Sequence, residues 1–366
     1  MSEMLYNKYR PKILSEVVGH DSVIKELSKR SKDDSFSHTM LFTGQTGIGK
    51  TTLQRIVSKN ILCQKKDDKG NSCNVCDVCK TVDEEKQSNF YFEYNASNLN
   101  IDEVRSLVEN AGVKSFSNAK NKVFVIDEIQ EMKKSQAALN NLLKPLEKEY
   151  KNVYFILGTM SEKDIPQAIK NRCTTYKLKP LNMEEISKCL YDICQKEGVA
   201  IDTSDKAEVL VTIGDNSYGS LRTAISYLER TINSELWTVN EVINELEIIS
   251  NTDLVKSINY LMQGDSKAFD IVYSKELIEK IRYMFGSMYK VLSGIEIPKW
   301  QSMSLQGISK TITLEQVDHA LEKLFQLNQY PYLSQDLIDF VLIQILNDNK
   351  HRVKLSEEVK PRRRGQ

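Results

Sequence analysis

The chain has 366 residues, which exceeds the ~100–200 residues of one typical domain and predicts two or three domains. Hydrophobic residues make up 40% and charged residues 27%, a composition that excludes a disordered or fibrous protein. The 50 Lys and Arg residues balance the 50 Asp and Glu residues. A nucleic-acid partner would therefore require basic side chains gathered on one surface, because the chain has no overall positive charge.

The sequence predicts neither a membrane span nor export. No apolar run approaches the ~18–20 residues that cross a bilayer, and the first residues lack the apolar segment of a signal peptide. Seven cysteines, an odd number, argue against a disulfide framework. Four of them lie between Cys63 and Cys79, which favours a metal site in a reducing environment. We expect a cytoplasmic protein without a membrane partner.

The first half of the chain predicts strands that alternate with helices. Apolar runs predict strands at 39–43, 91–97, 122–128, 153–159 and 174–181, and helical spacing predicts helices at 50–62, 101–110 and 135–150. Pro145 could kink the last of these helices. The alternation predicts an α/β domain with a mainly parallel sheet.

The second half of the chain carries the 3.6-residue period of helices almost throughout. The predicted helices are 183–197, 205–213, 219–233, 239–250, 252–263, 266–293, 314–327 and 334–348. A long loop is expected from Ile295 to Thr311, and the basic tail at 360–366 is expected to be disordered. One α/β domain is therefore followed by ~180 residues of helix.

A glycine-rich segment between the first strand and its helix fits the phosphate-loop pattern G-x-x-x-x-G-K-[ST]. Its residues are Gly44, Gln45, Thr46, Gly47, Ile48, Gly49, Lys50 and Thr51, followed by Thr52. Backbone N–H groups of such a loop surround phosphates at a helix N-terminus. Lys50 would reach the β- and γ-phosphates of ATP, and the Thr51 hydroxyl would bind Mg²⁺. The alternative is a chance match, which the flanking strand and helix disfavour.

A second acidic motif follows the predicted strand at 122–128. Asp127 and Glu128 end this apolar run, at the edge where open α/β sheets bind their ligands. Asp127 would orient Mg²⁺ and Glu128 would act as general base toward the attacking water. Many strands end in acidic residues, but the phosphate loop upstream favours a shared site.

Four cysteines form a possible metal site within the segment 63–80, which has the composition of an insertion. Cys63, Cys73, Cys76 and Cys79 supply four thiolates, enough to close a tetrahedral structural Zn²⁺ site. Four free thiols or an iron–sulfur cluster are the alternatives. Closed coordination leaves no open position for catalysis, so the metal would stabilise a segment too small for its own core.

In combination, these motifs resemble those of the γ/τ ATPase subunits of bacterial DNA polymerase III clamp loaders, in the AAA+ superfamily. Further stretches agree with this family over about residues 5–235. Two N-terminal stretches are similar to the family segment that surrounds the adenine, and they comprise Tyr9, Arg10 and Pro11, then Val17, Val18, Gly19 and His20. The stretch from Asn141 to Glu147 resembles the family's LLK-x-LE helix.

The resemblance implies roles for three further residues. Thr159 stands at the family's sensor 1 position near the γ-phosphate, and Arg222 at its sensor 2 position in the lid. Arg172 stands in the place of the arginine of the family's Ser-Arg-Cys motif, which reaches a neighbouring subunit's γ-phosphate as an arginine finger. The alternatives are a surface arginine for Arg172 and a lid salt bridge for Arg222. Two departures are Asn171, where the family has serine, and Gln130, where it usually has histidine.

The resemblance also implies a domain plan. We expect an AAA+ ATPase domain at 1–180 with a four-cysteine zinc module at 63–79, and a helical lid at 181–243. A helical oligomerisation collar at 244–355 and a flexible basic tail at 356–366 would follow. Without the family's long carboxyl extension, the sequence is typical of a minimal γ-like form, from a phage or a compact bacterial genome.

The function that the resemblance implies is that of an ATP hydrolase, the motor subunit of a sliding-clamp loader. ATP binding would open the clamp, and hydrolysis triggered by DNA would release it on primed template. The expected partners are other loader subunits in a pentameric ring, the sliding clamp and primer–template DNA, contacted through Arg105 and Lys144. The alternatives are a non-hydrolysing structural loader subunit, or another AAA+ DNA-processing ATPase such as a helicase loader or a branch-migration motor.

Overall fold

The computed structural model describes residues 3–113, 119–134, 136–147, 150–246, 248, 251–270, 273, 275–297, 305, 307–330 and 334–358. The chain divides into two compact units, Met1–Trp237 and Thr238–Gln366, and each is described by itself. Among the described residues, no helix combines the length and apolarity that crossing a bilayer requires.

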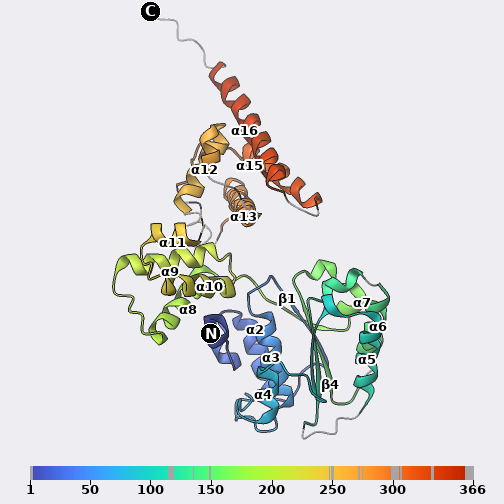
Figure 1. The fold of residues 1–366 in the computed structure, drawn as a ribbon. Coiled ribbons are helices and arrows are strands. Elements are labelled where there is room, and N and C mark those ends of the chain that lie inside the picture. Colours follow the sequence, from blue (N-terminus) through green and yellow to red (C-terminus); the bar gives the residue numbers. More distant parts are fainter. Residues whose placement is uncertain are drawn as a thin grey trace, which may run out of the picture. The chain divides into compact units, whose positions relative to one another are not determined.

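A five-stranded sheet forms the centre of the first unit (Figure 1). Its strands are β1 (Thr39–Thr43), β2 (Tyr91–Asn95), β3 (Lys122–Asp127), β4 (Val153–Thr159) and β5 (Thr174–Lys177). They lie in the order β2-β3-β4-β1-β5, and every neighbouring pair is parallel. The predicted α/β domain with a parallel sheet is therefore confirmed. The last strand is shorter than predicted because Pro180 and its neighbours leave the ladder.

The register brings the carboxyl ends of the strands to one edge. Thr43 pairs with Thr159 across β1 and β4, and Asn95 pairs with Asp127 across β2 and β3. The segments that follow β1, β3 and β4 therefore emerge side by side, where open parallel sheets bind ligands.

Both faces of the sheet are covered, so alternate strand residues enter two different cores. One core holds Met40, Phe42 and Val125 with residues of α2 (Asp21–Lys32) and α3 (Lys50–Leu62). The other holds residues of α5 (Ile101–Gly112) and α6 (Gln136–Glu147), which includes Pro145. Figure 1 shows α3 and α5 on opposite sides of the strands.

Short elements complete this part of the first unit. They are α1 (Leu5–Lys8), α4 (Asp77–Asp83) and α7 (Gln167–Lys170), with 3-10 helices η1 (Leu14–Glu16), η2 (Ala96–Asn98), η3 (Ile129–Lys134) and η4 (Glu162–Asp164). The hydrophobic pattern of the sequence does not predict α1, α2, α4 or α7.

Three helices follow the sheet in the first unit, close to the predicted bounds. They are α8 (Met183–Lys196), α9 (Ser204–Asn216) and α10 (Leu221–Asn233), which pack against one another. Asn182 and Glu185 form a capping box at the start of α8, and the Ser220 side chain caps α10.

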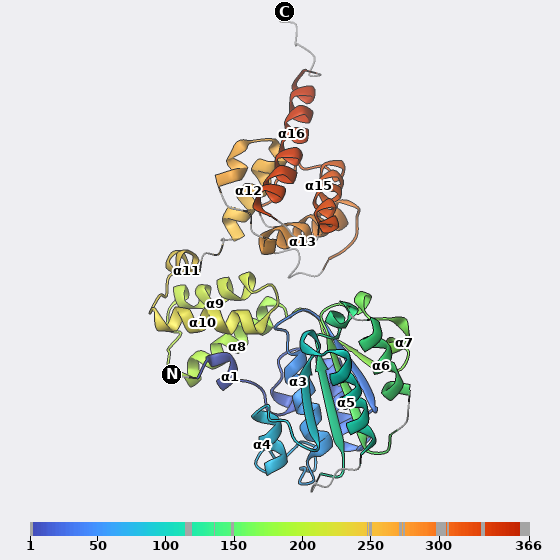
Figure 2. The ribbon, with the colours of Figure 1, turned by 45° about the vertical axis from the view of Figure 1, so that its right-hand side comes forward.

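The second unit is entirely helical in its described part. Its elements are α11 (Val239–Leu246), α12 (Asn251–Gln263), η5 (Ser266–Asp270), α13 (Lys275–Leu292), α15 (Leu314–Gln326), η6 (Leu327–Gln329) and α16 (Gln335–Glu358). Figure 2 shows α12, α13, α15 and α16 gathered together, and their buried apolar side chains form one core.

Two predicted boundaries in the second unit are wrong. Instead of a continuous helix over 266–293, the chain forms η5 and α13 as separate elements, and the Asp265 carboxylate caps the start of η5. Helix α16 continues to Glu358, past the predicted end at residue 348. The basic residues 360–366 lie outside the described residues.

Candidate nucleotide and metal sites

The glycine-rich loop connects β1 to α3 at the carboxyl edge of the sheet. Gly44, Gly47 and Gly49 adopt φ values of +149°, +80° and +107°, which residues with a Cβ atom rarely adopt. A Cβ atom at Gly47 would also lie 2.1 Å from the Ser220 hydroxyl. The loop therefore requires glycine, and its successive N–H groups are of the kind that bind phosphate.

Lys50 begins α3 and points back into this loop. Its side chain is buried, and Nζ donates hydrogen bonds to the carbonyls of Gly44 (2.7 Å) and Gln45 (3.1 Å). Burial lowers the pKa of Lys50, while the carboxylates of Glu128 and Asp127 oppose this effect. These two carbonyls carry only partial negative charge. A phosphate bound in the loop would give the Lys50 ammonium a fully charged partner.

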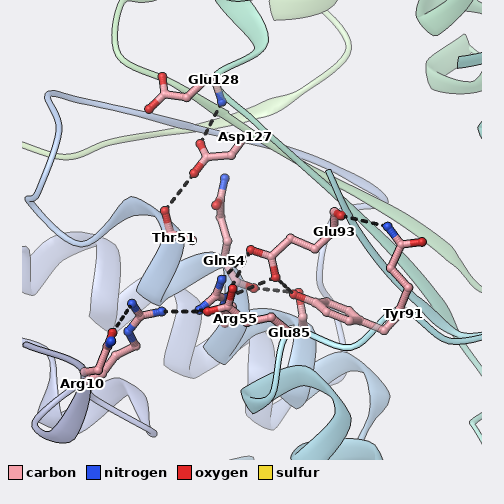
Figure 3. Close-up of polar contacts among 12 residues, drawn as sticks. Arg10, Thr51, Gln54, Arg55, Glu85, Tyr91, Glu93, Asp127 and Glu128 are labelled. Carbon is pink, nitrogen blue, oxygen red and sulfur yellow. Dashed lines mark hydrogen bonds and ion pairs between the residues drawn. The ribbon is translucent and has the colours of Figure 1, made fainter. Parts of the chain in front are cut away.

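The structure brings Thr51 and Asp127 into direct contact, as Figure 3 shows. Thr51 Oγ1 donates to Asp127 Oδ2 at 2.8 Å, although the two residues lie 76 positions apart. The other carboxylate oxygen, Oδ1, accepts from the backbone N–H of Glu128 at 2.9 Å. A hydroxyl and a carboxylate placed beside a phosphate loop are oxygen ligands that fit Mg²⁺.

Glu128 and Thr159 are linked by hydrogen bonds through Gln130, a residue to which the sequence motifs assign no role. Gln130 Nε2 donates to Glu128 Oε2 at 2.5 Å, and Gln130 Oε1 accepts from Thr159 Oγ1 at 2.8 Å. Thr159 is fully buried, and Glu128 has a φ of +53°. The sequence signals for Gln130 are its place two residues after the acidic pair and its departure from the histidine that is usual in the γ/τ family.

Gln54 is a second residue that the sequence reading missed. It is fully buried one turn after Thr51, and within the described part of the chain neither of its amide atoms has a hydrogen-bond partner. A Cβ atom at Gly158 would lie 2.5 Å from Gln54 Nε2 and 2.1 Å from Asp127 Oδ1. Gly158 is therefore what allows the amide and the carboxylate to approach this strand.

A partly buried charge cluster lies below the loop on the α3 face (Figure 3). The guanidinium of Arg55 pairs with Glu93 at 2.7 Å and with Glu85 at 2.5 Å, and Tyr91 Oη donates to Glu93 at 2.5 Å. Burial alone would lower the pKa of Arg55, but the hydrogen bonds to Glu93 and Glu85 prevail and raise it. Arg10 Nη1 lies 3.8 Å from Glu85, which connects the N-terminal segment to this cluster.

The four predicted zinc ligands converge after α3. Their Sγ atoms all lie within 4.8 Å of one another, and three separations are 3.6 Å (Cys63–Cys73), 4.0 Å (Cys73–Cys79) and 3.5 Å (Cys76–Cys79). With Zn–S bonds of ~2.3 Å, the edges of a regular tetrahedron measure about 3.8 Å. The cluster therefore fits a closed zinc site. Lys59 of α3 pairs with Asp83 of α4 at 2.8 Å, which attaches this module to the helix.

Comparison with known proteins gives similarities to subunits of DNA polymerase III. A family model described as "DNA polymerase III, delta subunit" matches residues 19–182. The DNA polymerase III subunit gamma of Buchnera aphidicola subsp. Baizongia pistaciae is 27% identical over 89% of this chain and 87% of its own length. The chain is thus similar to DNA polymerase III γ/τ subunits over most of its length. The resemblance inferred from the motifs is therefore confirmed.

Other relatives are longer than the part that this chain matches. The subunit gamma/tau of Mycoplasma genitalium is 32% identical over 74% of this chain but only 45% of its own length. The subunit tau of Escherichia coli is 29% identical over 63% of this chain and 35% of its own length. The solved Thermotoga maritima RuvB Holliday junction branch migration motor is 15% identical, with a TM-score of 0.47 over 86% of this chain and 90% of RuvB, a likeness too weak to carry an argument.

The predicted sensor 2 residue lies at the loop. The backbone N–H of Arg222 donates to the Gly47 carbonyl at 3.2 Å, and Gln45 Nε2 donates to the Tyr218 carbonyl at 2.6 Å. The guanidinium of Arg222 lies 5.7 Å from the centre of the Tyr6 ring. The start of α10 and the phosphate loop are thus in direct contact.

The predicted adenine-binding segment contacts both the loop and the residue that follows α8. His20 Nε2 donates to the Ile48 carbonyl at 3.0 Å, and Tyr9 Oη donates to Glu197 at 2.5 Å. Pro11, Val17 and Val18 are half-buried. The segment thus lies beside the loop, whose Thr46 and Thr52 side chains are exposed and half-buried, respectively.

Arg172 lies at the other end of the sheet. Its backbone carbonyl accepts from Thr39 at the amino end of β1, and its guanidinium pairs with Glu147 at 2.7 Å. The five residues of β1, about 13 Å in length, separate this point from the loop. The structure does not bring Arg172 to the phosphate loop of its own chain.

The two predicted DNA contacts are on helices of the other sheet face. Arg105 is exposed on α5 and pairs with Asp102 one turn earlier at 2.9 Å. Lys144 belongs to α6, but its side chain lies outside the described residues.

Proposed function

We propose that this chain is the ATP-hydrolysing motor subunit of a sliding-clamp loader in DNA replication. The observation that carries the proposal is the hydrogen bond between Thr51 and Asp127, because it joins the two motifs that a Mg²⁺–ATP site requires. The relationship to the γ/τ subunits supports the choice of a clamp loader among ATPases of this architecture.

In this proposal different residues bind the phosphates, hold the metal ion and activate the attacking water. The N–H groups of the loop and Lys50 bind the phosphates, while Thr51 and Asp127 hold the metal ion. Mg²⁺ would neutralise the charge that develops on the transferred phosphoryl group. Glu128 accepts a proton from the attacking water, and Thr159 contacts the γ-phosphate. Helices α8–α10 act as the lid, and Arg222 would couple the position of the lid to the bound nucleotide.

The proposal assigns Arg172 to a neighbouring subunit's site. Its place at the amino end of β1, away from its own loop, supports a finger that acts in trans. Its ion pair with Glu147 is exposed enough to exchange for a phosphate at a subunit interface. An isolated chain would then bind ATP but hydrolyse it very slowly. The helices of the second unit would form the collar, within a ring of other loader subunits.

The four-cysteine cluster has a structural role in this proposal. Cys63, Cys73, Cys76 and Cys79 would hold Zn²⁺, and closed coordination leaves it no catalytic position. A structural loader subunit that does not hydrolyse ATP is the second candidate. The intact Lys50, Thr51, Asp127 and Glu128 disfavour it, since such a subunit has no need of them.

The test is ATP hydrolysis by the complex that copurifies with this chain through an affinity tag, with and without clamp and primed DNA. We expect DNA to stimulate the wild-type rate. Glu128→Gln should lower the stimulated rate by about 10²–10⁴, and Arg172→Ala by about 10³ or more. Both variants should keep their ATP affinity.

Arg30→Ala is the matched control, because Arg30 is another exposed arginine that pairs with a glutamate. It should hydrolyse ATP like the wild type. A wild-type complex without ATPase activity would favour the structural subunit. Hydrolysis indifferent to DNA and to Arg172 would refute the loader mechanism.

A further inference from the structure

The amide of Gln130 forms a bridge inside the candidate site. Gln130 is 9% exposed in η3, directly after the turn that follows β3. Its Nε2 donates to Glu128 Oε2 at 2.5 Å. Its Oε1 accepts from Thr159 Oγ1 at 2.8 Å and from the backbone N–H of Met160 at 3.3 Å. Both ends of the amide are therefore used.

The chemistry of the bridge is specific. A carboxylate only accepts hydrogen bonds, and the Thr159 hydroxyl donates its one proton either to Gln130 Oε1 or to the Ser161 carbonyl at 3.1 Å. A residue that bonds to both Glu128 and Thr159 in this way must donate at one end and accept at the other. Glutamine does this in one orientation of its amide. A methionine of similar size would provide neither bond, whereas a histidine can donate from one ring nitrogen and accept at the other.

The bridge joins residues from two neighbouring strands. Glu128 follows β3 and Thr159 ends β4. We propose that Gln130 is a positioning residue, which holds the carboxylate of Glu128 and the hydroxyl of Thr159 in one fixed arrangement. The inference rests on the proposed function, in which Glu128 is the general base.

Positioning of this kind affects the rate of hydrolysis and leaves nucleotide affinity unchanged. Gln130 fixes one carboxylate oxygen of Glu128, and a glutamate that lacks this bond samples several rotamers, only some of which can take a proton from water. A general base contributes about 10²–10⁴ to a rate, and its misplacement loses part of this factor. Gln130 itself has no role in binding the phosphates.

The test uses two substitutions at Gln130, measured in the tagged complex with clamp and primed DNA. Gln130→Met should lower kcat about tenfold and leave the ATP dissociation constant of the chain within about twofold. Gln130→His should restore kcat to within about threefold of wild type, because it can make both bonds. Glu128→Gln provides the reference for complete loss of the base.

A double substitution tests the bridge itself. If Gln130 acts through Thr159 as well as Glu128, Gln130→Met should lower kcat less in a Thr159→Val background than in the wild type. Two independent contributions would multiply instead, and that result would overturn the coupling.

Other outcomes separate this inference from the function on which it rests. A wild-type complex that fails to hydrolyse ATP contradicts the proposed function. If the wild type is active and Glu128→Gln is not, a Gln130→Met variant with wild-type kcat overturns only the inference. Equal losses in the methionine and histidine variants also overturn it, as does a loss confined to ATP affinity.

Discussion

Helix α3 in the first unit and helix α15 in the second have the same length of 13 residues but bury very different side chains. In α3 eleven residues are buried, among them Lys50, Arg55 and Lys59. In α15 the buried residues are Val317, Ala320 and Leu324, one apolar stripe with polar residues around it. One helix is covered on nearly all sides, and the other on a single face.

The difference has a structural cause. Helix α3 contacts the sheet, α2 and α4, so most of its charged residues are buried. Because a buried charge is costly unless it is paired, these residues need partners within the protein. Arg55 and Lys59 pair with carboxylates, and Lys50 donates to the loop carbonyls. The charged residues of α3 are therefore both buried and paired within the protein, and one of them, Lys50, belongs to the candidate nucleotide site. Helix α15, in contrast, adds only apolar side chains to the core of the second unit.

The largest effect is expected from the metal ligands, which enclose α3 on one side. Cys79→Ala should abolish zinc binding at the proposed site and open α3 to solvent, because structural zinc contributes folding free energy directly. Metal analysis and hydrogen exchange of residues 50–62 measure both effects. The control is Cys189→Ala, a half-buried cysteine of α8, which should keep the metal.

Exchange in α15 should stay unchanged in Cys79→Ala. Equal zinc content in the Cys79→Ala variant and the wild type would contradict the site, and faster exchange in α15 would contradict the separation of the units.

A smaller loss of stability is expected from the buried ion pairs of α3. Arg55→Met leaves the largely buried carboxylate of Glu93 without its charge partner, which should lower the free energy of unfolding by about 3–5 kcal/mol, while the exposed Glu85 keeps Arg10 nearby. Arg30→Met removes an exposed ion pair and should cost at most about 1 kcal/mol. Urea unfolding compares the two. Equal losses of unfolding free energy in the two variants would mean that burial does not determine how much the ion pairs of α3 stabilise the protein.

The apolar stripe of α15 predicts the opposite profile. Leu324→Ala creates a cavity in the second unit and should cost about 2–5 kcal/mol of stability there. The change should leave ATP affinity as in the wild type. Leu314 lies on the same helix but is 37% exposed, so Leu314→Ala should cost much less. A loss of ATP binding in Leu324→Ala would show that the two regions are not separate in function.

The smallest effect in this series concerns the contact between Asp127 and β4. Gly158→Ala would place a Cβ atom 2.1 Å from Asp127 Oδ1, so the carboxylate must shift. We expect the Mg²⁺ concentration for half-maximal hydrolysis to rise about tenfold, equivalent to ~1.4 kcal/mol. Gly112→Ala meets no atom within 4 Å and serves as the control. An unchanged Mg²⁺ requirement in Gly158→Ala would contradict the place of Asp127.

The same comparison explains what sequence reading could predict. The stripe of α15 repeats every three to four residues, so its period alone predicts the helix within one residue at each end. The apolar runs of β1, β3 and β4 likewise predict buried parallel strands. Helix α2 was missed because its charged residues outnumber its apolar ones.

Contacts between distant residues could not be predicted in this way. The partners of Arg55 lie 30 and 38 residues away, and Gln130 meets Thr159 across 29 residues. No local period carries such information. The motifs predict candidate residues for the site, and the fold places two further residues, Gln54 and Gln130, beside them.

The most direct test of a nucleotide site in the first unit is the equilibrium binding of Mg²⁺–ATP to the full chain, compared with Lys50→Ala. We expect one ATP per chain and an affinity that falls about tenfold to a hundredfold in the variant, since charge-assisted hydrogen bonds to phosphate are lost. A wild-type chain that does not bind ATP, or a Lys50→Ala variant with unchanged affinity, would contradict it.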